Sequence, residues 1–319
     1  MVEVSHQPSR GAVDCLFFGD VFCDLVFTGV DLPQRGAEVF SSAFAVSPGG
    51  CANRAVAAAR AGARSAVLAQ VGDDALSRAV IELLGREPGL DLTWLRVVPG
   101  STTSVTVALS TPAERSFITH LGDLTPAAAP GGLTRPGSLH VGLGKPVPEW
   151  VATLRAGGTE VVGGVGWDAT EQWSRETLDR LSQVDIAVLN DTEATAYTRT
   201  RTAREALAEL SHRVGLTVVT RGEAGAIALD ARTGQFSEAS AWPVNAVDPT
   251  GAGDVFVGTF MAARCRGWDL PTQLRFACAC ASLSTTGLGG AVSAPHIADL
   301  VAYIAANHPA GDWAFLDEA

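Results

Sequence analysis

The stretch NAVDPTGAGDVFVGTF, residues 245–260, places three small residues and one aspartate just before a run with helical periodicity. Gly251, Ala252 and Gly253 carry no bulky side chain, so another molecule can approach their backbone closely. The pattern predicts a helix that begins at this turn and ends near Gly267. Unpaired amides at a helix N-terminus, together with the helix dipole, favour an anion such as a phosphate group. We therefore expect an anion-binding turn here.

Asp254 stands on the first turn of this predicted helix, where its carboxylate would lie beside a bound phosphate. An aspartate at this position also has an ordinary structural role, because acids stabilise helix N-termini. An isolated GAGD sequence is more often such a cap than a catalytic group. The rest of the chain therefore has to decide between the two interpretations.

The composition of the 319 residues bounds the class of protein. Hydrophobic residues make up 47% and charged residues 18%, yet no stretch approaches the roughly 18 uncharged apolar residues that a membrane span needs. The formal net charge of −11, without a cluster of Lys and Arg, argues against nucleic-acid and membrane partners. The start MVEVSHQPSRGAVDCLFF lacks the basic beginning and the cleavage site of a signal peptide. We expect a soluble protein in the cytoplasm.

The residue types that usually bind metals or nucleotides show none of the common motifs. The six cysteines form no CxxC pair and no disulfide framework, so we expect buried free thiols, and the six histidines are too scattered for a zinc site. Lys145 follows Gly144, but the other residues of a phosphate-binding P-loop are missing around them. No GxGxxG motif opens a helix after the first strand, which argues against a Rossmann dehydrogenase. Protein-kinase and GxSxG motifs are absent as well.

Strand-like and helix-like segments alternate along most of the chain. This alternation is typical of parallel strands joined by right-handed helical crossovers, and the apolar strands suit a sheet that is covered on both faces. We predict strands at 15–19, 65–72, 138–143, 160–166, 186–190 and 216–222. We predict helices at 53–62, 73–85, 147–158, 169–181, 202–215 and 254–267.

Two segments interrupt this rhythm, at about 25–48 and 101–125, where short alternating strands and turn residues replace helices. We expect them to pair as a small sheet that acts as a lid on the main body. The sequence contains no repeat, no low-complexity tract and no Gly/Ser linker. We therefore predict a single α/β domain over residues 1–319 that carries this lid.

Four motifs resemble those of one family. DPTGAGDVFVGTF resembles the C-terminal signature of the PfkB (ribokinase-like) carbohydrate kinases, with Thr259 where that family usually has glycine or alanine. GGCANRAVAAARAGARSAVLAQVG resembles their N-terminal signature, although it is one residue short between Gly50 and Asn53 and carries Cys51 there. NDTE and TRGEAG resemble the family's NxxE motif and its strand-end nucleotide loop. Each motif alone has an ordinary structural explanation, but their joint occurrence in this order favours the family.

The resemblance implies a ribokinase-like three-layer αβα sandwich with a mostly parallel central sheet and a small β-sheet lid. It also implies an ATP-dependent kinase that transfers the γ-phosphate to a hydroxyl of a small sugar or sugar derivative. Asp254 would be the base that accepts the hydroxyl proton, and the amides of Gly251, Ala252 and Gly253 would form the anion hole. Phosphoryl transfer asks mainly for alignment and charge neutralisation, which a carboxylate beside a ring of amides supplies.

The same resemblance assigns further residues by position. The ATP side comprises Asn190, Glu193, Thr220, Gly222 and Gly225, and Glu193 with Asn190 would organise Mg²⁺ largely through water. The substrate side comprises Asp24, Gly49, Gly50 and Asn53. A monovalent cation such as K⁺ would lie by Asp248, Thr250, Ser284, Gly287, Gly289 and Ser293.

Departures from ribokinase leave the substrate open. Phe22 stands where ribokinase has a sugar-contacting asparagine, the lysine of its GGKGAN is missing, and its later pocket glutamate falls on Gly144. Ribose is therefore disfavoured, and Phe22 either stacks on a sugar or base or belongs to the core. A nucleoside kinase of the same family and a non-catalytic sugar-binding sensor are the alternatives. Apolar residues in the lid segments also suggest a homodimer.

Overall fold

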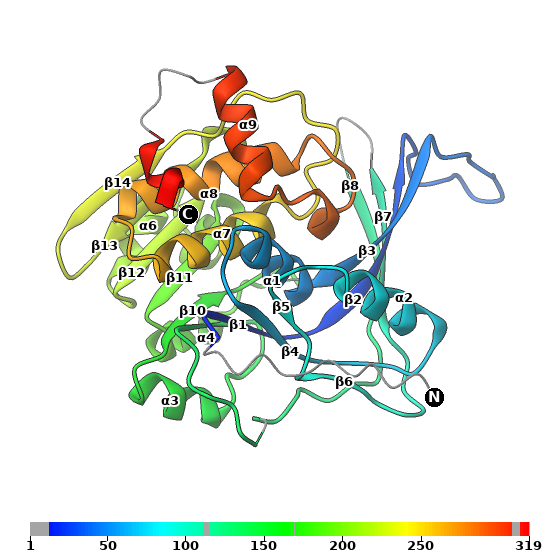
Figure 1. Cartoon of the computed structure of the whole chain (residues 1–319), viewed down its shortest axis with the longest axis horizontal. Helices are drawn as coiled ribbons and strands as arrows, with labels where there is room; N and C mark the ends of the chain where they lie inside the picture. Colours follow the sequence, from blue (N-terminus) through cyan, green and yellow to red (C-terminus); the bar gives the residue numbers. More distant parts are fainter. Residues whose placement is uncertain (1–12, 111–114, 130, 169, 308–312, 319) are drawn as a thin grey trace.

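The structure, a computed structural model, describes residues 13–110, 115–129, 131–168, 170–307 and 313–318. A large sheet lies between helices, and a smaller sheet extends from one side of this body (Figure 1).

The large sheet has ten strands among the described residues, in the order β14-β13-β12-β11-β10-β9-β1-β4-β5, with β6 paired to β4. Neighbours from β12 to β5 are parallel, whereas β13 and β14 are antiparallel. The strands are β1 (Cys15–Phe18), β4 (Ser65–Val71), β5 (Leu90–Asp91), β6 (Leu95–Val97), β9 (Ser138–Gly142), β10 (Glu160–Gly164), β11 (Ile186–Asn190), β12 (Leu216–Thr220), β13 (Ala226–Asp230) and β14 (Gln235–Ala239).

Side chains along the central strands alternate between two cores, one on each face of the sheet. In β1, Cys15 and Phe17 belong to one core and Leu16 to the other. In β11, Ile186 belongs to the first core and Ala187 to the second. Because successive side chains of a strand point to opposite faces, an apolar run without polar interruptions requires cover on both sides.

Helices supply that cover. The first core receives buried residues from α1 (Cys51–Arg60), α2 (Ala75–Leu84), α7 (Ala252–Cys265), α8 (Leu270–Ser284) and α9 (Ile297–Asn307). The second core receives them from α3 (Glu149–Ala156), α4 (Arg175–Asp179), α5 (Asp191–Thr198) and α6 (Ala203–Ser211). Short 3₁₀ helices lie at Arg180–Gln183, Gly222–Ala224, Gly290–Ser293 and Ala314–Glu318. The predicted three-layer sandwich is confirmed, and no helix in the described part of the chain is long and apolar enough to cross a membrane.

Helices α1 and α7 pack closely against each other, which brings the two sequence signatures together. Gly258 of α7 faces α1, and a Cβ atom added there would lie 2.3 Å from the carbonyl oxygen of Arg54 and 2.9 Å from Ala57 Cβ. Only glycine allows this approach. As a result, Asn53 and Arg54 lie beside Asp254 on the first turn of α7.

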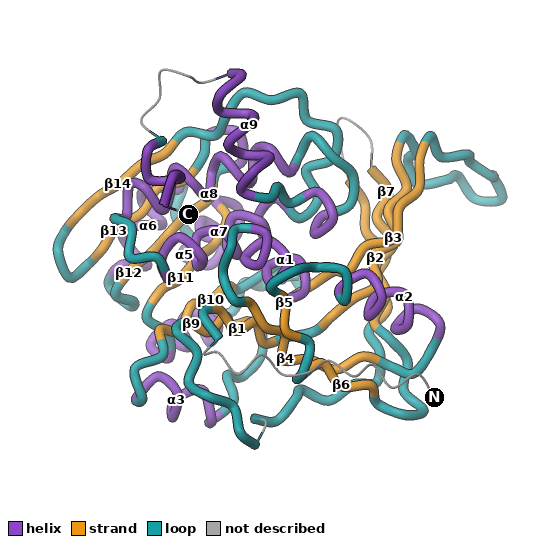
Figure 2. The backbone as a smooth tube through the Cα atoms, in the orientation of Figure 1, coloured by secondary structure: helices purple, strands orange, loops and turns teal. Residues whose placement is uncertain are grey.

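The small sheet has four strands in the order β3-β2-β7-β8. They are β2 (Val21–Thr28), β3 (Ala43–Gly50), β7 (Ser104–Ser110) and β8 (Arg115–His120). The β2–β3 and β7–β8 pairs are antiparallel and the β2–β7 pair is parallel. These strands stand together at one side of the body (Figure 2), as predicted for a lid sheet. Because β2 starts before the predicted segment, Asp24 lies inside the small sheet.

The predicted helix over 169–181 is wrong in its first half, and residue 169 itself lies outside the described residues. The Asp168 carboxylate accepts hydrogen bonds from the amides of Thr170, at 2.9 Å, and Trp173, at 2.7 Å. Trp173 also has a positive φ of 50°. Such a turn competes with helix formation, so α4 begins only at Arg175.

The cysteine prediction is also wrong at one position. All six thiols are free, and five of them are buried, but Cys265 is exposed. It is the last residue of α7, where the helix reaches the surface. Although most of α7 is apolar and buried, its last residue is therefore exposed.

Candidate active site

The N-terminus of α7 has the backbone of an anion-binding turn. Gly251 forms the N-cap in a left-handed conformation, with φ 78° and ψ −2°. A Cβ atom added there would lie 2.6 Å from the Cα atom of Gly290, so a side chain would both strain the backbone and collide. Helix α7 begins at Ala252, and no side-chain cap satisfies its first amides. The Ala252 amide donates a long hydrogen bond, 3.3 Å, to the Pro249 carbonyl, and the other amides of this first turn are available to an anion.

Both carboxylate oxygens of Asp254 are held by the start of α1. The side-chain amide of Asn53 donates a hydrogen bond to Oδ2 at 3.2 Å. Nη2 of Arg54 forms an ion pair with Oδ1 at 2.8 Å. The carboxylate is thus oriented beside the first turn of its own helix, which no side chain caps, and about a quarter of its side chain, 23%, stays exposed.

Arg54 is a site residue that the sequence reasoning missed. Its side chain is only 27% exposed, and its Nε is buried with no hydrogen-bond partner among the described residues. Its charge also acts on Glu193, so one guanidinium lies between the two groups of predicted site residues. The sequence signal was an arginine directly after Asn53 in an otherwise alanine-rich helix. In the structure, the residues next to Arg54 in α1 are buried.

Asp24 is a partly buried carboxylate in β2. A Cβ atom added at Gly49 would lie 2.2 Å from Asp24 Oδ2, so the acid lies directly over that glycine. Burial raises the pKa of Asp24 to about 7, and the negative charge of Asp254 adds to this effect, while a hydrogen bond from Thr106 opposes it. No ion pair in the described chain includes Asp24. The group is therefore about half protonated near neutral pH.

A cavity of about 360 Å³ adjoins these residues. Its lining includes Phe22, Gly50 and Arg54, together with an exposed ion pair in which Lys145 Nζ lies 2.8 Å from Asp20 Oδ2. In β2 the buried residues alternate with Phe22 and Asp24, which share the other face. Phe22 thus lines the cavity rather than the core. The cavity suits a polar molecule with one apolar face.

The NxxE motif lies at the carboxyl end of β11. Asn190 caps α5: its Oδ1 accepts a hydrogen bond from the Glu193 amide at 2.7 Å, and Glu193 Oε2 accepts one from the Asn190 amide at 3.2 Å. Asn190 is the register partner of Thr220, the last residue of β12. Because carboxyl ends of parallel strands share one edge, the two motifs lie side by side. The ordinary capping role of NxxE is thus also fulfilled.

The loop after β12 is closed by its own backbone. The Arg221 amide donates a hydrogen bond to the Gly225 carbonyl at 2.7 Å, and the Gly225 amide donates one to the Gly222 carbonyl at 3.0 Å. Gly222 and Gly225 both have positive φ. This tight loop holds its backbone at the same sheet edge as Asn190.

Asp248 is a buried carboxylate beneath the α7 turn, only 1% exposed. Its Oδ1 accepts a hydrogen bond from the Thr250 amide at 2.9 Å, and its Oδ2 accepts one from the Gly289 amide at 3.1 Å. Thr250 Oγ1 is buried with no partner among the described residues. Ser293 Oγ donates to the Gly290 carbonyl nearby, whereas Ser284 Oγ is bonded back to its own helix.

The residues predicted for the ATP side fit a Mg²⁺ ion that is bound mainly through phosphate and water. Burial raises the pKa of Glu193, although the Asn190 amide and the charge of Arg54 oppose this shift. No ion pair within the described residues includes Glu193 or Asp248. The same residues contain no group of three or more His, Cys, Asp and Glu side chains that would hold a metal alone. Mg²⁺ accompanying nucleotide phosphates needs only one or two carboxylates.

A three-layer sandwich with a small second sheet, and an uncapped helix start beside an oriented aspartate, are the features expected of a small-molecule kinase. The family described as pfkB family carbohydrate kinase matches residues 14–131 and 149–297, and the chain belongs to that family. The predicted family and the predicted phosphotransferase class are thereby confirmed.

Characterised relatives carry several substrate names. A ribokinase of Bacillus subtilis is 28% identical over 281 residues, covering 85% of this chain and 92% of the relative. A fructokinase of Klebsiella pneumoniae is 32% identical over 286 residues, covering 79% and 90%. A cytidine kinase of Thermococcus kodakarensis is 28% identical over 242 residues, covering 72% and 84%.

Solved structures show the same fold. Arabidopsis thaliana ribokinase complexed with ribose and ATP has a TM-score of 0.78 at 24% identity and covers 92% of this chain and 98% of that one. An E. coli ribokinase II in complex with ATP and Mg²⁺ has a TM-score of 0.76 at 21% identity and covers 92% and 100%.

Asp24→Asn should raise the free energy of unfolding at about pH 8 and have little effect at about pH 4. The folded-state pKa of about 7 lies above the ordinary value of 3.8, so the folded chain holds this proton more tightly than the unfolded chain. The stability that the group contributes is complete below the unfolded pKa and is lost as the pH rises through 7. Urea unfolding of both proteins across this range measures the difference.

Asp123→Asn is the matched control, because a hydrogen bond from the Thr102 amide holds the pKa of Asp123 below its usual value. This variant should lose stability at high pH and recover toward wild type in acid. A stability difference between Asp24→Asn and wild type that does not change with pH would show that Asp24 has the same pKa in the folded and the unfolded chain.

Proposed function

We propose that the protein is an ATP-dependent kinase that transfers the γ-phosphate to a hydroxyl of a small sugar or sugar derivative. The observation that supports this best is the position of Asp254. It lies on the first turn of α7, beside amides that no side chain caps, and Arg54 joins it to the cavity of about 360 Å³. In this proposal the carboxylate and the anion hole share the start of α7, and Arg54 connects them with the cavity that receives the acceptor.

In this proposal Asp254 accepts the proton of the attacking hydroxyl, while Asn53 and Arg54 orient the two carboxylate oxygens of Asp254. The amides of Ala252 and Gly253 stabilise the charge on the transferred phosphoryl group. Asp24, half protonated near neutral pH, either donates a hydrogen bond to another acceptor hydroxyl or accepts one. Positioning and charge neutralisation then carry most of the rate enhancement.

The ATP groove in this proposal runs along Thr220, Gly222 and Gly225, with Glu193 and Asn190 holding Mg²⁺ through water. Bound Mg²⁺ neutralises charge on the phosphate oxygens. The tight loop and the capping box fix these groups at one sheet edge.

A monovalent cation, K⁺ in the first instance, fits beside Asp248, Thr250 and Ser293. The carboxylate of Asp248 is buried without an ion pair in the described chain, and Thr250 Oγ1 has no partner there. A cation at this point would offset the buried negative charge of Asp248 and stabilise the turn at Gly251.

A nucleoside kinase is the second candidate, because Phe22 lines the cavity on the same face of β2 as Asp24. An aromatic ring there can stack on a base as well as on a sugar face. A non-catalytic sensor is disfavoured by the complete arrangement around Asp254. The acceptor assay below separates all three.

Wild-type protein with Mg·ATP should release ADP with one member of a panel of pentoses, hexoses, sugar acids, sugar phosphates and nucleosides. Asp254→Asn should lower that turnover by about 10²–10⁴-fold, the range for loss of a general base. Coupled ADP release, with and without K⁺, measures both.

The control for this assay is that Asp254→Asn keeps the unfolding midpoint and the ATP affinity of wild type. Turnover that survives in the folded variant contradicts the role of Asp254. ATP binding without turnover on any acceptor favours the sensor instead.

Arg54 is the group that we expect to meet the γ-phosphate. The transferred phosphoryl group has to lie between Asp254 and the amides of α7, which brings it within reach of the guanidinium that is bonded to Asp254. An arriving phosphate offers the acceptor that Arg54 Nε lacks. Because it also competes for the guanidinium, it would release one oxygen of Asp254 for the acceptor hydroxyl.

Arg54→Met should therefore weaken ATP binding much more than ADP binding, because ADP lacks the phosphate group in question. We expect the Kd for ATP to rise about tenfold to a hundredfold, since a hydrogen bond to a charged group contributes roughly 1.5–3 kcal/mol. Calorimetric titration with Mg²⁺ and no acceptor measures both affinities. Arg86→Met, which removes an exposed charge from the end of α2, should change neither. Equal losses for ATP and ADP would leave Arg54 a purely structural role.

The small sheet and the loop between β2 and β3 expose several large apolar side chains. Phe40, Phe44, Phe117 and Ile118 are 83%, 54%, 53% and 57% exposed. Phe117 and Ile118 point to opposite faces of the edge strand β8, and exposed apolar side chains on an edge strand favour pairing with another chain. We infer that two copies pair through the small sheet.

Wild-type protein should therefore have twice the chain mass of 33.0 kDa in solution, by light scattering at micromolar concentration. Changing Phe117 and Ile118 together to Ser should give monomers, because it removes apolar area from the contact. Val97→Ser, at an exposed apolar position on β6, is the control and should leave the dimer intact. A monomeric wild type would rule out the pairing.

A further inference from the structure

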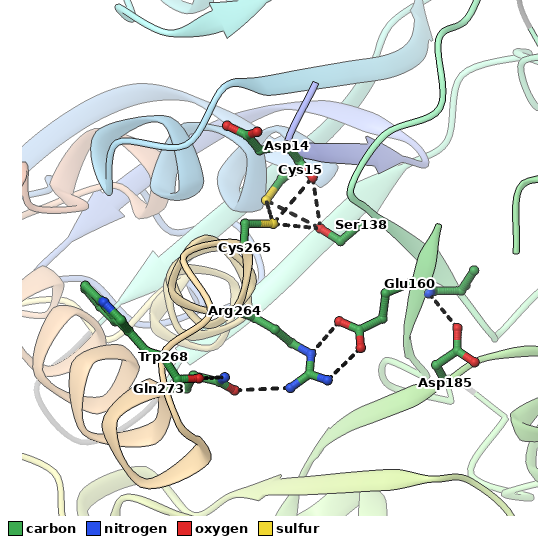
Figure 3. Close-up of polar contacts among 10 residues, drawn as sticks. Asp14, Cys15, Ser138, Glu160, Asp185, Arg264, Cys265, Trp268 and Gln273 are labelled. Carbon is green, nitrogen blue, oxygen red and sulfur yellow. Dashed lines mark hydrogen bonds and ion pairs between the residues drawn. The ribbon is translucent and has the colours of Figure 1, made fainter. Parts of the chain in front are cut away.

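Two thiols that are far apart in the sequence meet at the end of α7 that is opposite Asp254. Cys15 is the first residue of β1 and Cys265 is the last residue of α7. Their Sγ atoms lie 3.6 Å apart. Ser138 Oγ lies 3.5 Å from Cys15 Sγ and 3.6 Å from Cys265 Sγ, and Figure 3 shows the three side chains turned toward one another. The Cys265 thiol also reaches the Asp14 carbonyl at 3.5 Å.

The two thiols differ in access and in acidity. Cys15 is completely buried, whereas Cys265 is exposed. The hydrogen bond between them lowers the pKa of Cys265 and raises that of Cys15, and burial raises the latter further. Cys265 is therefore the sulfur that a solvent-borne reagent meets, and it more readily forms the thiolate that reacts. Cys15 is placed behind it as a second thiol.

The other four thiols offer no such pair. Burial raises the pKa of Cys23 to about 11 and those of Cys51 and Cys278 to about 12, and it also raises that of Cys280. All four are buried. A buried thiol in apolar surroundings is inert toward reagents in water.

We propose that Cys15 and Cys265 form a thiol–disulfide exchange site that closes to an internal disulfide. The Cys265 thiolate attacks one sulfur of a low-molecular-weight disulfide such as oxidised glutathione, and the first glutathione leaves and takes up a proton. Cys15 then loses its proton and attacks Cys265 Sγ in the mixed disulfide, which releases the second glutathione. Two protein thiols are oxidised and one glutathione disulfide is reduced to two thiols. The sulfurs have to close from 3.6 Å to a bond of about 2.0 Å.

The new bond would fasten the C-terminus of α7 to the start of β1. Helix α7 has 14 residues, so at about 1.5 Å per residue its two ends are about 20 Å apart. The disulfide therefore clamps the helix that carries Asp254 without touching the reacting groups. The inference does not depend on the proposed kinase activity.

The test treats the full chain with excess oxidised glutathione in the absence of reductant and measures the intact mass. The chain is then unfolded in denaturant, its remaining thiols are alkylated, and its peptides are analysed. We expect the mass to fall by two hydrogens, one linked peptide pair that contains Cys15 and Cys265, and alkylation of the other four cysteines. A stable glutathione adduct on Cys265, or no reaction at all, would overturn the proposal.

Three variants sharpen this test. Cys15→Ser should stop at a glutathione adduct on Cys265, because no second thiol resolves it. Cys265→Ser should not react, and Cys280→Ala should close as wild type does. Reaction of the Cys265→Ser chain at Cys15 contradicts the assigned order of attack. If Cys15→Ser does not fold, the peptide map of the wild type still decides the case.

Discussion

The left-handed backbone at Gly251, pressed against Gly290, is the constraint on which the site depends. It turns the chain directly into α7 and leaves the first amides of that helix uncapped. The buried carboxylate of Asp248 holds this arrangement from below, because its two oxygens tie the amides of Thr250 and Gly289 together. The amides of Val247 and Asp248 both donate hydrogen bonds to the carbonyl of Thr285, the C-cap residue of α8. A buried charge is thus used to fix backbone rather than to bind substrate.

The close packing of α1 on α7 places the remaining polar groups. Gly258 lets the α1 backbone approach α7, and the small residues of α1 make the approach possible along its length. Thr259, which departs from the usual glycine or alanine, fits because its buried hydroxyl donates to the Val255 carbonyl within the same helix. The alanine-rich sequence of α1 therefore has a structural consequence: it aligns Asn53 and Arg54 with Asp254.

Features set by local chemistry were predictable from the sequence. The apolar strands, their covering helices and the turn at Gly251 follow from periodicity and from the needs of the backbone. Features set by tertiary contact were not. An arginine in an alanine-rich helix reads as a solvated residue until α7 is packed against it, so Arg54 was missed. Cys15 and Cys265 are 250 positions apart, and only the fold brings them together.

Two further errors do not come from tertiary contact. Periodicity suggested a helix after Asp168, but that side chain bonds the backbone ahead of it and delays the helix. The antiparallel strands β13 and β14, with helices α8 and α9, passed unnoticed because their sequences carry no strand and helix alternation of the crossover kind. In each case a competing local bond or a change of topology outweighed the pattern.

The charges of the site show why an acidic protein can still receive a nucleotide. Asp24, Asp254 and Glu193 lie near one another in a chain of net charge −11, and three full negative charges there would repel phosphate. Their repulsion is reduced in two ways. Burial raises the pKa of Asp24 to about 7 and also raises the pKa of Glu193. In addition, Arg54 forms an ion pair with Asp254. The helix dipole and uncapped amides of α7 add positive potential without adding a titratable group. A phosphate group and its cation would complete the balance, so these groups are arranged for charge that the substrate brings.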